Sequence, residues 1–543
     1  MASLRTAWNA VYGNKQFLAY ALIALLVSIW ATEILLIQHW SACPSAAIKT
    51  DILFKDSARR MALNITACGF LICLLHRNLL TLAFSLWALS LSILMVYSNY
   101  FGRPLSYTVF INQTHEGLAV SDAALTFLQW EIIAFAFFAF VLKVTISTVI
   151  PRKQIPKQVY FRWAASYAVC YLLLAFFLAG VHKPIREIRL GSPEYTYGYT
   201  VAWITEYLTF DSSAILQDAK EKSKAKSDVL VNIDSAFPLG THVAVVQVES
   251  LDYLAVESEV RNEFVMPFLK SLHEIAMTYS VKPFHKTGSS EADFSLLMAA
   301  TPIGSLNPFQ VPGFSYEQSL PKLASQRGYR SIAFHGNTGS FFQRRNAYEQ
   351  MGFDEIFFSE ELATHQIAGE WDEELLAFSA KTFRAAKDSQ FHFIITITSH
   401  VPFKKLPIEK RELYKHPATI QERYLNNMRY VDRTLKSYVE QLPDDTTVVI
   451  YGDHESNIRG YASCDIHHDR VPWFIFQKGR TLSRSQRSQK GGLALSGNLN
   501  QLDMACYLRE CISATQQNGF QFLPKDRPER SATGPQTGST TIR

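Results

Sequence analysis

The sequence predicts an N-terminal bundle of about five transmembrane helices, followed by an α/β domain with a mostly parallel central sheet. Long apolar runs crowd into the first third of the chain, and short β-branched runs alternate with helix-like stretches after residue 239. With 48% hydrophobic residues, 25 glycines and 21 prolines among 543 residues, the chain is neither wholly disordered nor collagen-like. A net charge of +5 is too small for this length to indicate nucleic-acid binding.

Five apolar runs have about the length that a membrane-spanning helix requires. They occupy residues 17–37, 61–75, 79–98, 123–142 and 163–181. The second and third runs are separated by three polar residues, so we expect them to form a tight helical hairpin. Buried helices of a soluble protein are the alternative, but five such runs in one segment disfavour it.

The positions of Lys and Arg predict the orientation of this bundle. Arg5 and Lys15 precede the first run, and five more basic residues lie between the fourth and fifth runs, at 143–162. With five spans, both segments fall on the cytoplasmic side, although four basic residues at 49–60 weakly favour the opposite orientation. Everything after residue 182 is then expected outside the cytoplasmic membrane.

The composition divides the chain into four segments. We expect a transmembrane domain at 1–182, a juxtamembrane connector at 183–238 with a charged helix near 216–230, an extracytoplasmic α/β domain at 239–523, and a disordered tail at 524–543. The seven cysteines do not form a disulfide framework, because only three of them belong to the soluble part, and no CxxC zinc spacing occurs.

Five short apolar runs are expected to form the central sheet. They occupy residues 242–248, 329–334, 391–398, 446–451 and 471–476, and helix-like stretches separate them. Continuous apolar strands of this kind are typical of a sheet covered by helices on both faces.

Metal-binding side chains follow four of these strands. Glu249, His335 and His400 come at or just after the ends of the first three, and Asp453 with His454 follows the fourth. In open α/β sheets, sites collect at the carboxyl ends of the strands. Turn residues explain a single case, but four coinciding cases favour a shared site. Glu, Asp and His together suit a divalent cation such as zinc or manganese.

A candidate nucleophile lies in the segment 285–300, HKTGSSEADFSLLMAA. Gly288 permits a sharp turn, and Ser290 with Asp293 has the spacing of a capping box at the start of a helix. A serine hydroxyl is a weak nucleophile unless a base or a metal lowers its pKa, which a position beside the cation would do for Ser289. Both serines could instead simply cap the helix.

Three further residues are candidates for phosphate contact. Arg344, in GNTGSFFQRR, can make bidentate contacts with a phosphate, although a surface arginine is an equal alternative. His467 or His468 precedes the last strand and could approach a phosphate or a second cation. The sequence does not favour one of these two histidines over the other, and each could equally be a solvated loop histidine.

Together these motifs resemble the lipoteichoic acid synthase type of phosphoglycerol transferase, within the alkaline phosphatase/sulfatase superfamily. The resemblance runs in order through VVQVESLD, TGSSEADF, FHGNTGSFFQRRNAYEQMGFDEIFF, TITSHVPF and YGDHES. It covers most of residues 243–456. The segment FHGN-x-x-SF-x-x-R is the most specific match, whereas YGDH is shared more widely across the superfamily.

The resemblance implies a role for each matched residue. Glu249, Ser289, Asp453 and His454 would bind the cation, usually manganese in this family, with zinc as the alternative, and Ser289 would be the nucleophile. His335, Arg344 and His400 would contact the phosphoglycerol group. Two positions depart from the family pattern: Ser289 matches a residue that is typically Thr, with Ser290 beside it, and Phe342 matches a Trp.

The expected function is the transfer of a phosphoglycerol group from a phospholipid, with phosphatidylglycerol favoured, to an envelope polymer or glycan through a phospho-serine intermediate. Phosphoethanolamine transfer is the alternative within the same chemistry, and a membrane-tethered lipid- or glycan-binding protein without catalysis is the alternative from another class. Sulfatase activity is not expected, because the segment from Ser289 lacks the Pro and Arg of the C/S-x-P-x-R signature.

Overall fold

The computed structural model describes residues 237–285, 288–304, 306–403, 406–456, 458, 470–480 and 499–514, with shorter stretches between residues 57 and 224. The expected transmembrane runs, the tail, and both His467 and His468 lie wholly or mostly outside these residues. Among the residues described, none of the helices combines the length and apolar character needed to cross a membrane.

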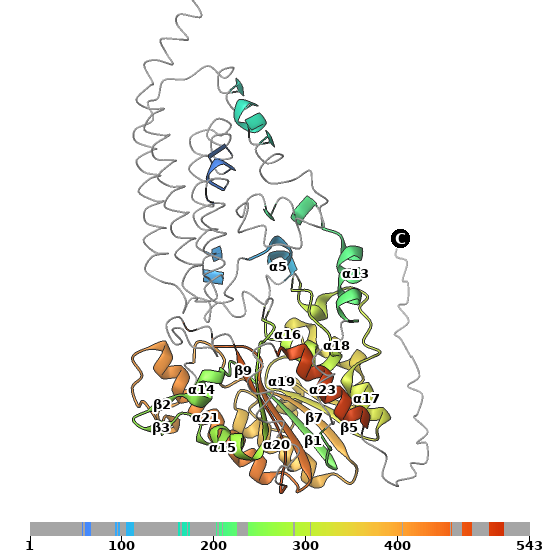
Figure 1. The fold of residues 1–543 in the computed structure, drawn as a ribbon, viewed down its shortest axis with the longest axis vertical. Helices are drawn as coiled ribbons and strands as arrows, with labels where there is room; N and C mark the ends of the chain where they lie inside the picture. Colours follow the sequence, from blue (N-terminus) through green and yellow to red (C-terminus); the bar gives the residue numbers. More distant parts are fainter. Residues whose placement is uncertain are drawn as a thin grey trace, which may run out of the picture.

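A seven-stranded, mostly parallel sheet organises the α/β domain, as the sequence predicted (Figure 1). Its spatial order is β4-β9-β8-β1-β7-β5-β6. The strands are β1 (His242–Val248), β4 (Met277–Val281), β5 (Arg330–His335), β6 (Glu355–Phe357), β7 (Gln390–Ile395), β8 (Thr446–Gly452) and β9 (Val471–Gln477). The five strands from β8 to β6 are mutually parallel, and β9 is antiparallel to both β8 and β4.

Both faces of the sheet are covered by helices, because the central strands are apolar on both sides. In β1, Val243 and Val245 belong to one core cluster, and Ala244 and Val246 belong to the other. The first face packs against α13 (Ser212–Lys222), α16 (Ser290–Met298), α17 (Leu320–Gln326), α18 (Arg344–Met351) and α23 (Gln501–Ala514). The second packs against α14 (Tyr253–Glu257), α15 (Pro267–Ile275), α19 (Ser359–Thr364), α20 (Asp372–Ala385) and α21 (Ile420–Gln441).

The structure also describes several smaller elements. They are α5 (Tyr107–Asn112), the strand pair β2 (Glu259–Val260) and β3 (Glu263–Phe264), and the 3₁₀ turns η3 (Pro308–Gln310), η4 (Phe341–Gln343) and η5 (Ile408–Lys410).

The five expected strands are all present, one of them shorter than expected, and the sheet has two further strands, β4 and β6. The strand predicted over 391–398 ends at Ile395, because the backbone N–H groups of Ile397 and Thr398 leave the sheet to donate to the buried carboxylate of Asp372. Strand β4 was not predicted, because its sequence MTYSV mixes polar and apolar residues although all five are buried.

Asp432, on α21, fixes helix α15 to the domain. Its carboxylate accepts hydrogen bonds from the backbone N–H groups of Phe268 and Leu269, at 2.9 and 2.8 Å. These groups lie in the first turn of α15, where N–H groups have no partner within the helix. The N-cap residue of α15, Met266, makes no side-chain cap, so Asp432 supplies the cap from another helix.

We expect Asp432→Ala to lower the free energy of unfolding by about 1–3 kcal/mol, because it leaves the first-turn N–H groups without their acceptor. Urea denaturation of the purified chain, followed by tryptophan fluorescence, measures this change. Lys436→Ala, on the same helix but with a side chain that is 59% exposed, is the control and should change stability by less than about 0.5 kcal/mol. Equal stability of the two variants would contradict the capping role.

Candidate functional site

Glu249, Asp453 and His454 meet at the carboxyl edge of the sheet. Glu249 follows β1 directly, and Asp453 with His454 follows the adjacent parallel strand β8. One ligand atom from each of the three lies within 4.8 Å of the other two, and all three residues are buried. Of the side chains expected to share a site, Glu249, Asp453 and His454 therefore lie close together in the fold.

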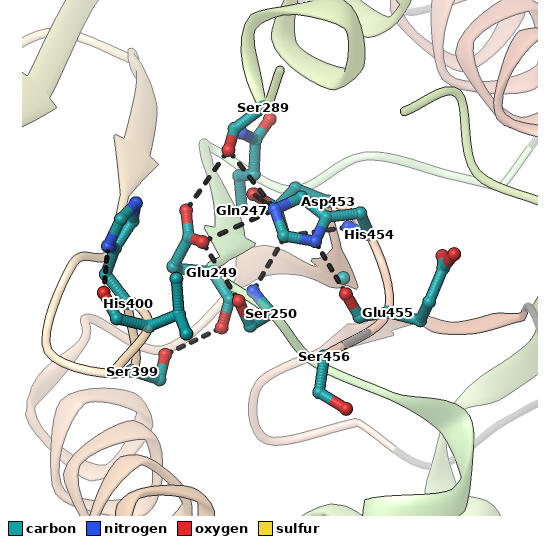
Figure 2. A network of polar contacts seen from close by, with 12 residues as sticks. Gln247, Glu249, Ser250, Ser289, Ser399, His400, Asp453, His454, Glu455 and Ser456 are labelled. Carbon is teal, nitrogen blue, oxygen red and sulfur yellow. Dashed lines mark hydrogen bonds and ion pairs between the residues drawn. The ribbon is translucent and has the colours of Figure 1, made fainter. Parts of the chain in front are cut away.

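Ser289, the N-cap residue of α16, points toward this group (Figure 2). Its Oγ lies 3.2 Å from His454 Nε2 and 3.4 Å from Glu249 Oε2. His454 Nε2 in turn lies 3.3 Å from Glu249 Oε1 and 3.5 Å from Asp453 Oδ2. Two carboxylates, an imidazole nitrogen and a hydroxyl thus face a common centre.

Backbone and hydroxyl groups hold the two carboxylates in place. Ser250, which has a left-handed backbone with φ of 56°, donates from its N–H to Asp453 Oδ1 at 2.8 Å and from its hydroxyl to Glu249 Oε1 at 3.0 Å. Ser399 donates its hydroxyl to the carbonyl oxygen of Glu249 at 2.6 Å. Hydrogen bonds therefore hold the ends of these strands together around the site.

The electrostatics of the group fit a bound cation. Burial and then the negative charge of Glu249 raise the pKa of Asp453 well above its usual range. Burial lowers the pKa of His454, but the two carboxylates outweigh it and raise that pKa to about 10. Burial raises the pKa of Glu249, yet the charges of His400 and His454 bring it well below its ordinary value. The carboxylates therefore require positive charge beside them.

The orientation of His454 also fits a metal ligand. Its Nδ1–H donates to the carbonyl oxygen of Glu455 at 2.7 Å, so Nε2 is the ring nitrogen that faces the two carboxylates. Metal-binding histidines commonly have this arrangement, in which the second nitrogen is held by a carbonyl or carboxylate. Among the described residues, Asp453 Oδ2 accepts no hydrogen bond, so it is available to a cation.

The two adjacent serines have different environments. Ser290 is completely buried, and its Oγ accepts a hydrogen bond from Asn307 Nδ2 at 2.5 Å. Ser289 is partly exposed and its hydroxyl faces the carboxylates. The geometry therefore places the hydroxyl of Ser289 in the site and turns that of Ser290 away from it.

The expected capping box at this helix is wrong. The N-cap of α16 is Ser289, and its side chain makes no cap hydrogen bond because it turns into the site. Asp293 does not reach back to the helix start either. Its carboxylate is instead engaged by Arg344 and Tyr348 from α18, at 2.9 and 2.7 Å.

His335 and Arg344 lie together at the end of β5, outside the three-residue metal group. His335 Nδ1–H donates to the carbonyl oxygen of Ile395 at 3.2 Å, and Arg344 Nη1 donates to His335 Nε2 at 3.4 Å. Burial and the charge of Arg344 lower the pKa of His335 to about 3, so this imidazole is neutral at physiological pH. Arg344 is buried and is not the surface arginine that the sequence left open.

Phe342 and His400 flank the site. The Phe342 ring lies 5.3 Å from the Arg344 guanidinium carbon, and it packs so closely on Gly288 that a Cβ there would lie 2.7 Å from it. His400 is partly exposed, its Nδ1–H donates to the carbonyl oxygen of Val401, and its charge acts on Glu249. The positions of His467 and His468 are not among the described residues, so their roles stay predictions.

His285 was missed by the sequence analysis. Its ring stacks on that of His454, with centroids 3.8 Å apart and planes 6° from parallel. The signal available was its position four residues before Ser289, in the segment that carries the nucleophile candidate. Many histidines that precede a loop serve no site, so this position alone does not identify a functional residue.

Comparison with known proteins finds a matching family model and similar proteins. The family model described as Sulfatase matches residues 241–492. A lipoteichoic acid synthase from Staphylococcus saprophyticus is 24% identical over 401 residues, covering 66% of this chain and 60% of that protein. One from Staphylococcus aureus is 23% identical over 425 residues, covering 71% and 63%. The match thus spans about six-tenths of the length of these relatives.

Solved structures extend the comparison to the fold. The integral membrane protein lipooligosaccharide phosphoethanolamine transferase A from Neisseria meningitidis has a TM-score of 0.52 and 13% identity, covering 92% of this chain and 96% of that one. A lipoteichoic acid synthase from Listeria monocytogenes has a TM-score of 0.41 and 19% identity, covering 54% and 81%. Residues 241–492 thus match the Sulfatase family model, and the chain is similar to lipoteichoic acid synthases over 66–71% of its length.

Proposed function

We propose that this chain is a membrane-anchored, metal-dependent transferase that moves a phosphoglycerol group from a phospholipid headgroup to an envelope polymer or glycan. The observation that carries the proposal is the Ser289 hydroxyl, which lies within 3.4 Å of both Glu249 and His454 at the carboxyl edge of the sheet. Phosphatidylglycerol is the proposed donor, in keeping with the sequence similarity to lipoteichoic acid synthases.

Glu249, Asp453, His454 and Ser289 are the residues that would hold the divalent cation, with manganese favoured and zinc as the alternative. A bound divalent cation lowers the pKa of a hydroxyl and neutralises charge on phosphate oxygens. The carboxylates and the imidazole contribute to this site by being buried and fixed, because a preorganised group needs no reorganisation when the charge of the substrate develops.

The transfer would proceed in two steps. Ser289 Oγ, after losing its proton to solvent, would form a bond to the donor phosphorus while the bond from phosphorus to the diacylglycerol oxygen breaks. This leaves a phospho-serine that still carries the glycerol. His400, or one of the histidines at 467 and 468, would act as the general acid that gives a proton to the departing alkoxide. An acceptor hydroxyl then attacks the same phosphorus and releases Ser289.

Arg344, His335 and Phe342 would form the binding site for the phosphoglycerol group. The guanidinium offers several N–H donors in a fixed plane, which suits phosphate oxygens. His335 stays neutral and Phe342 provides an apolar wall. The apolar runs before residue 182 would anchor the chain beside its insoluble donor and raise the effective concentration of that lipid, with the catalytic domain on the extracytoplasmic side.

Metal removal tests the cation site. We expect the purified chain, stripped with EDTA, to recover about one Mn²⁺ per chain and to gain about 3 kcal/mol of stability when Mn²⁺ reaches roughly 100 times its Kd. Asp453→Asn should abolish this gain, because it removes a charged ligand. Metal analysis and the thermal midpoint with and without Mn²⁺ measure both effects.

Asp444→Asn is the matched control for this experiment, since the Asp444 side chain is 89% exposed. It should bind Mn²⁺ and respond to it like the wild type. Wild-type affinity in Asp453→Asn would remove Asp453 from the site. A parallel titration with Zn²⁺ separates the two candidate metals by their relative affinities.

Donor specificity and the nucleophile are tested together with fluorescent phosphatidylglycerol and phosphatidylethanolamine. We expect diacylglycerol release from phosphatidylglycerol, abolished by chelation and reduced at least about 1,000-fold in Ser289→Ala, because the attacking oxygen is lost. Ser290→Ala should stay within about tenfold of the wild type, since it loses one hydrogen bond to Asn307.

Other outcomes of this assay would indicate a different donor, nucleophile or function for the chain. Release from phosphatidylethanolamine alone would make the chain a phosphoethanolamine transferase. An active Ser289→Ala with an inactive Ser290→Ala would shift the nucleophile by one position. No turnover of either lipid or of a soluble phosphodiester would favour a lipid- or glycan-binding protein without catalysis.

A further inference from the structure

A buried carboxylate links the nucleophile helix to the phosphate-binding arginine. Asp293 lies on α16 four residues after Ser289, so both residues are on the same side of this helix, one turn apart. Asp293 Oδ2 accepts from Arg344 Nε at 2.9 Å and from the Tyr348 hydroxyl at 2.7 Å. The side chains of Asp293 and Arg344 are only 0% and 3% exposed.

A buried ion pair of this kind does not stabilise a fold efficiently. The cost of removing both charges from water commonly exceeds their attraction, and well-packed apolar residues of similar volume are often as stable or more stable. Burial accordingly raises the pKa of Asp293 against the opposing charge of Arg344. Because the Asp293–Arg344 pair costs folding free energy and lies on the helix of Ser289, we infer that its role is to hold the site residues in position.

The contacts of Arg344 show how its guanidinium is held. Its Nε is held by Asp293, its Nη1 donates to His335 Nε2, and the Phe342 ring lies 5.3 Å from its central carbon. Among the described residues, Nη2 has no hydrogen-bond partner. Burial lowers the pKa of Arg344, but Asp293 and, more weakly, Tyr348 and Glu249 raise it above its ordinary value, so the charge of Glu249 also acts on the guanidinium.

We propose that Asp293 is a positioning residue, which fixes the guanidinium of Arg344 relative to the Ser289 hydroxyl and so sets where the phosphate of the donor sits for attack. The assignment rests on the proposed roles of Ser289 and Arg344. Because Asp293 and Ser289 share one helix, any displacement of that helix moves the nucleophile and the anchor of the arginine together. The distance from nucleophile to phosphate is thereby kept constant.

Phosphate binding by the Mn²⁺-loaded full chain tests this role apart from turnover. Calorimetric titration with inorganic phosphate is carried out on the wild type, Asp293→Asn, Arg344→Gln and the double variant. We expect Asp293→Asn to weaken phosphate binding about tenfold, with a matching rise in KM for the donor lipid that exceeds the change in kcat. In the Arg344→Gln background, Asp293→Asn should cause no further loss, because Asp293 acts through Arg344.

Arg344→Lys tests the same role without altering Asp293. It keeps the positive charge, but an ammonium cannot hold Asp293 and His335 and still present a flat donor edge to phosphate. We expect it to lose phosphate affinity nearly as far as Arg344→Gln. Arg345→Gln is the matched control, since the neighbouring Arg345 pairs with Glu360 and Glu361 at the surface, and it should bind phosphate like the wild type.

Several results would overturn the assignment. One is an equal loss of phosphate affinity from Asp293→Asn in the wild-type and Arg344→Gln backgrounds, and another is wild-type phosphate affinity in Arg344→Lys. The assignment would also fail if Asp293→Asn lowered the thermal midpoint but left the phosphate affinity of the folded fraction unchanged, or if the wild type bound no phosphate. Failure of the proposed function would give a different result. The single and double variants would still show that the effects of Asp293→Asn and Arg344→Gln on phosphate affinity depend on each other, but neither phospholipid would be turned over.

Discussion

The structure of the site depends on the charge repulsion between two buried carboxylates. Glu249 and Asp453 lie on adjacent parallel strands that end at the same edge, and neither is exposed to water. In such surroundings two negative charges remain close only if positive charge is placed between or beside them. A protonated His454 can supply this charge, or a divalent cation would supply it when the two carboxylates and a neutral imidazole face the ion.

The parallel arrangement of the sheet explains how distant residues reach this point. Strands β8, β1, β7 and β5 run in one direction, so the residues that follow them are brought to one edge although two hundred positions separate Glu249 from Asp453. The turn after β7 then departs from the sheet and supplies hydroxyl groups to the backbone of Glu249. The sheet thus determines where the site residues lie, and the loops that follow the strands determine how their side chains are oriented.

Most of this arrangement could be predicted from the sequence, because it depends on local patterns. Apolar runs predicted five strands, and side chains directly after them predicted Glu249, Asp453 and His454. What could not be predicted depends on contacts between distant segments. The pairing of Asp293 with Arg344, the stacking of His285 on His454, and the burial of Ser290 against Asn307 leave no periodic signal. A short capping pattern at Ser290 even indicated the wrong partner for Asp293, since tertiary contacts replaced the local one.

The segment after β5 contains two residues with a strained backbone. Phe342 and Gln343 both have left-handed backbones, with φ of 57° and 59°, and each such residue costs on the order of 1–3 kcal/mol. Glycine would adopt this backbone with less strain, but glycine has no ring to pack on Gly288 beside Ser289 or to lie against Arg344. An aromatic side chain is therefore held here at a cost because its ring is needed. The same turn starts helix α18 at Arg344, so a single strained bend determines the apolar wall and the position of the guanidinium together.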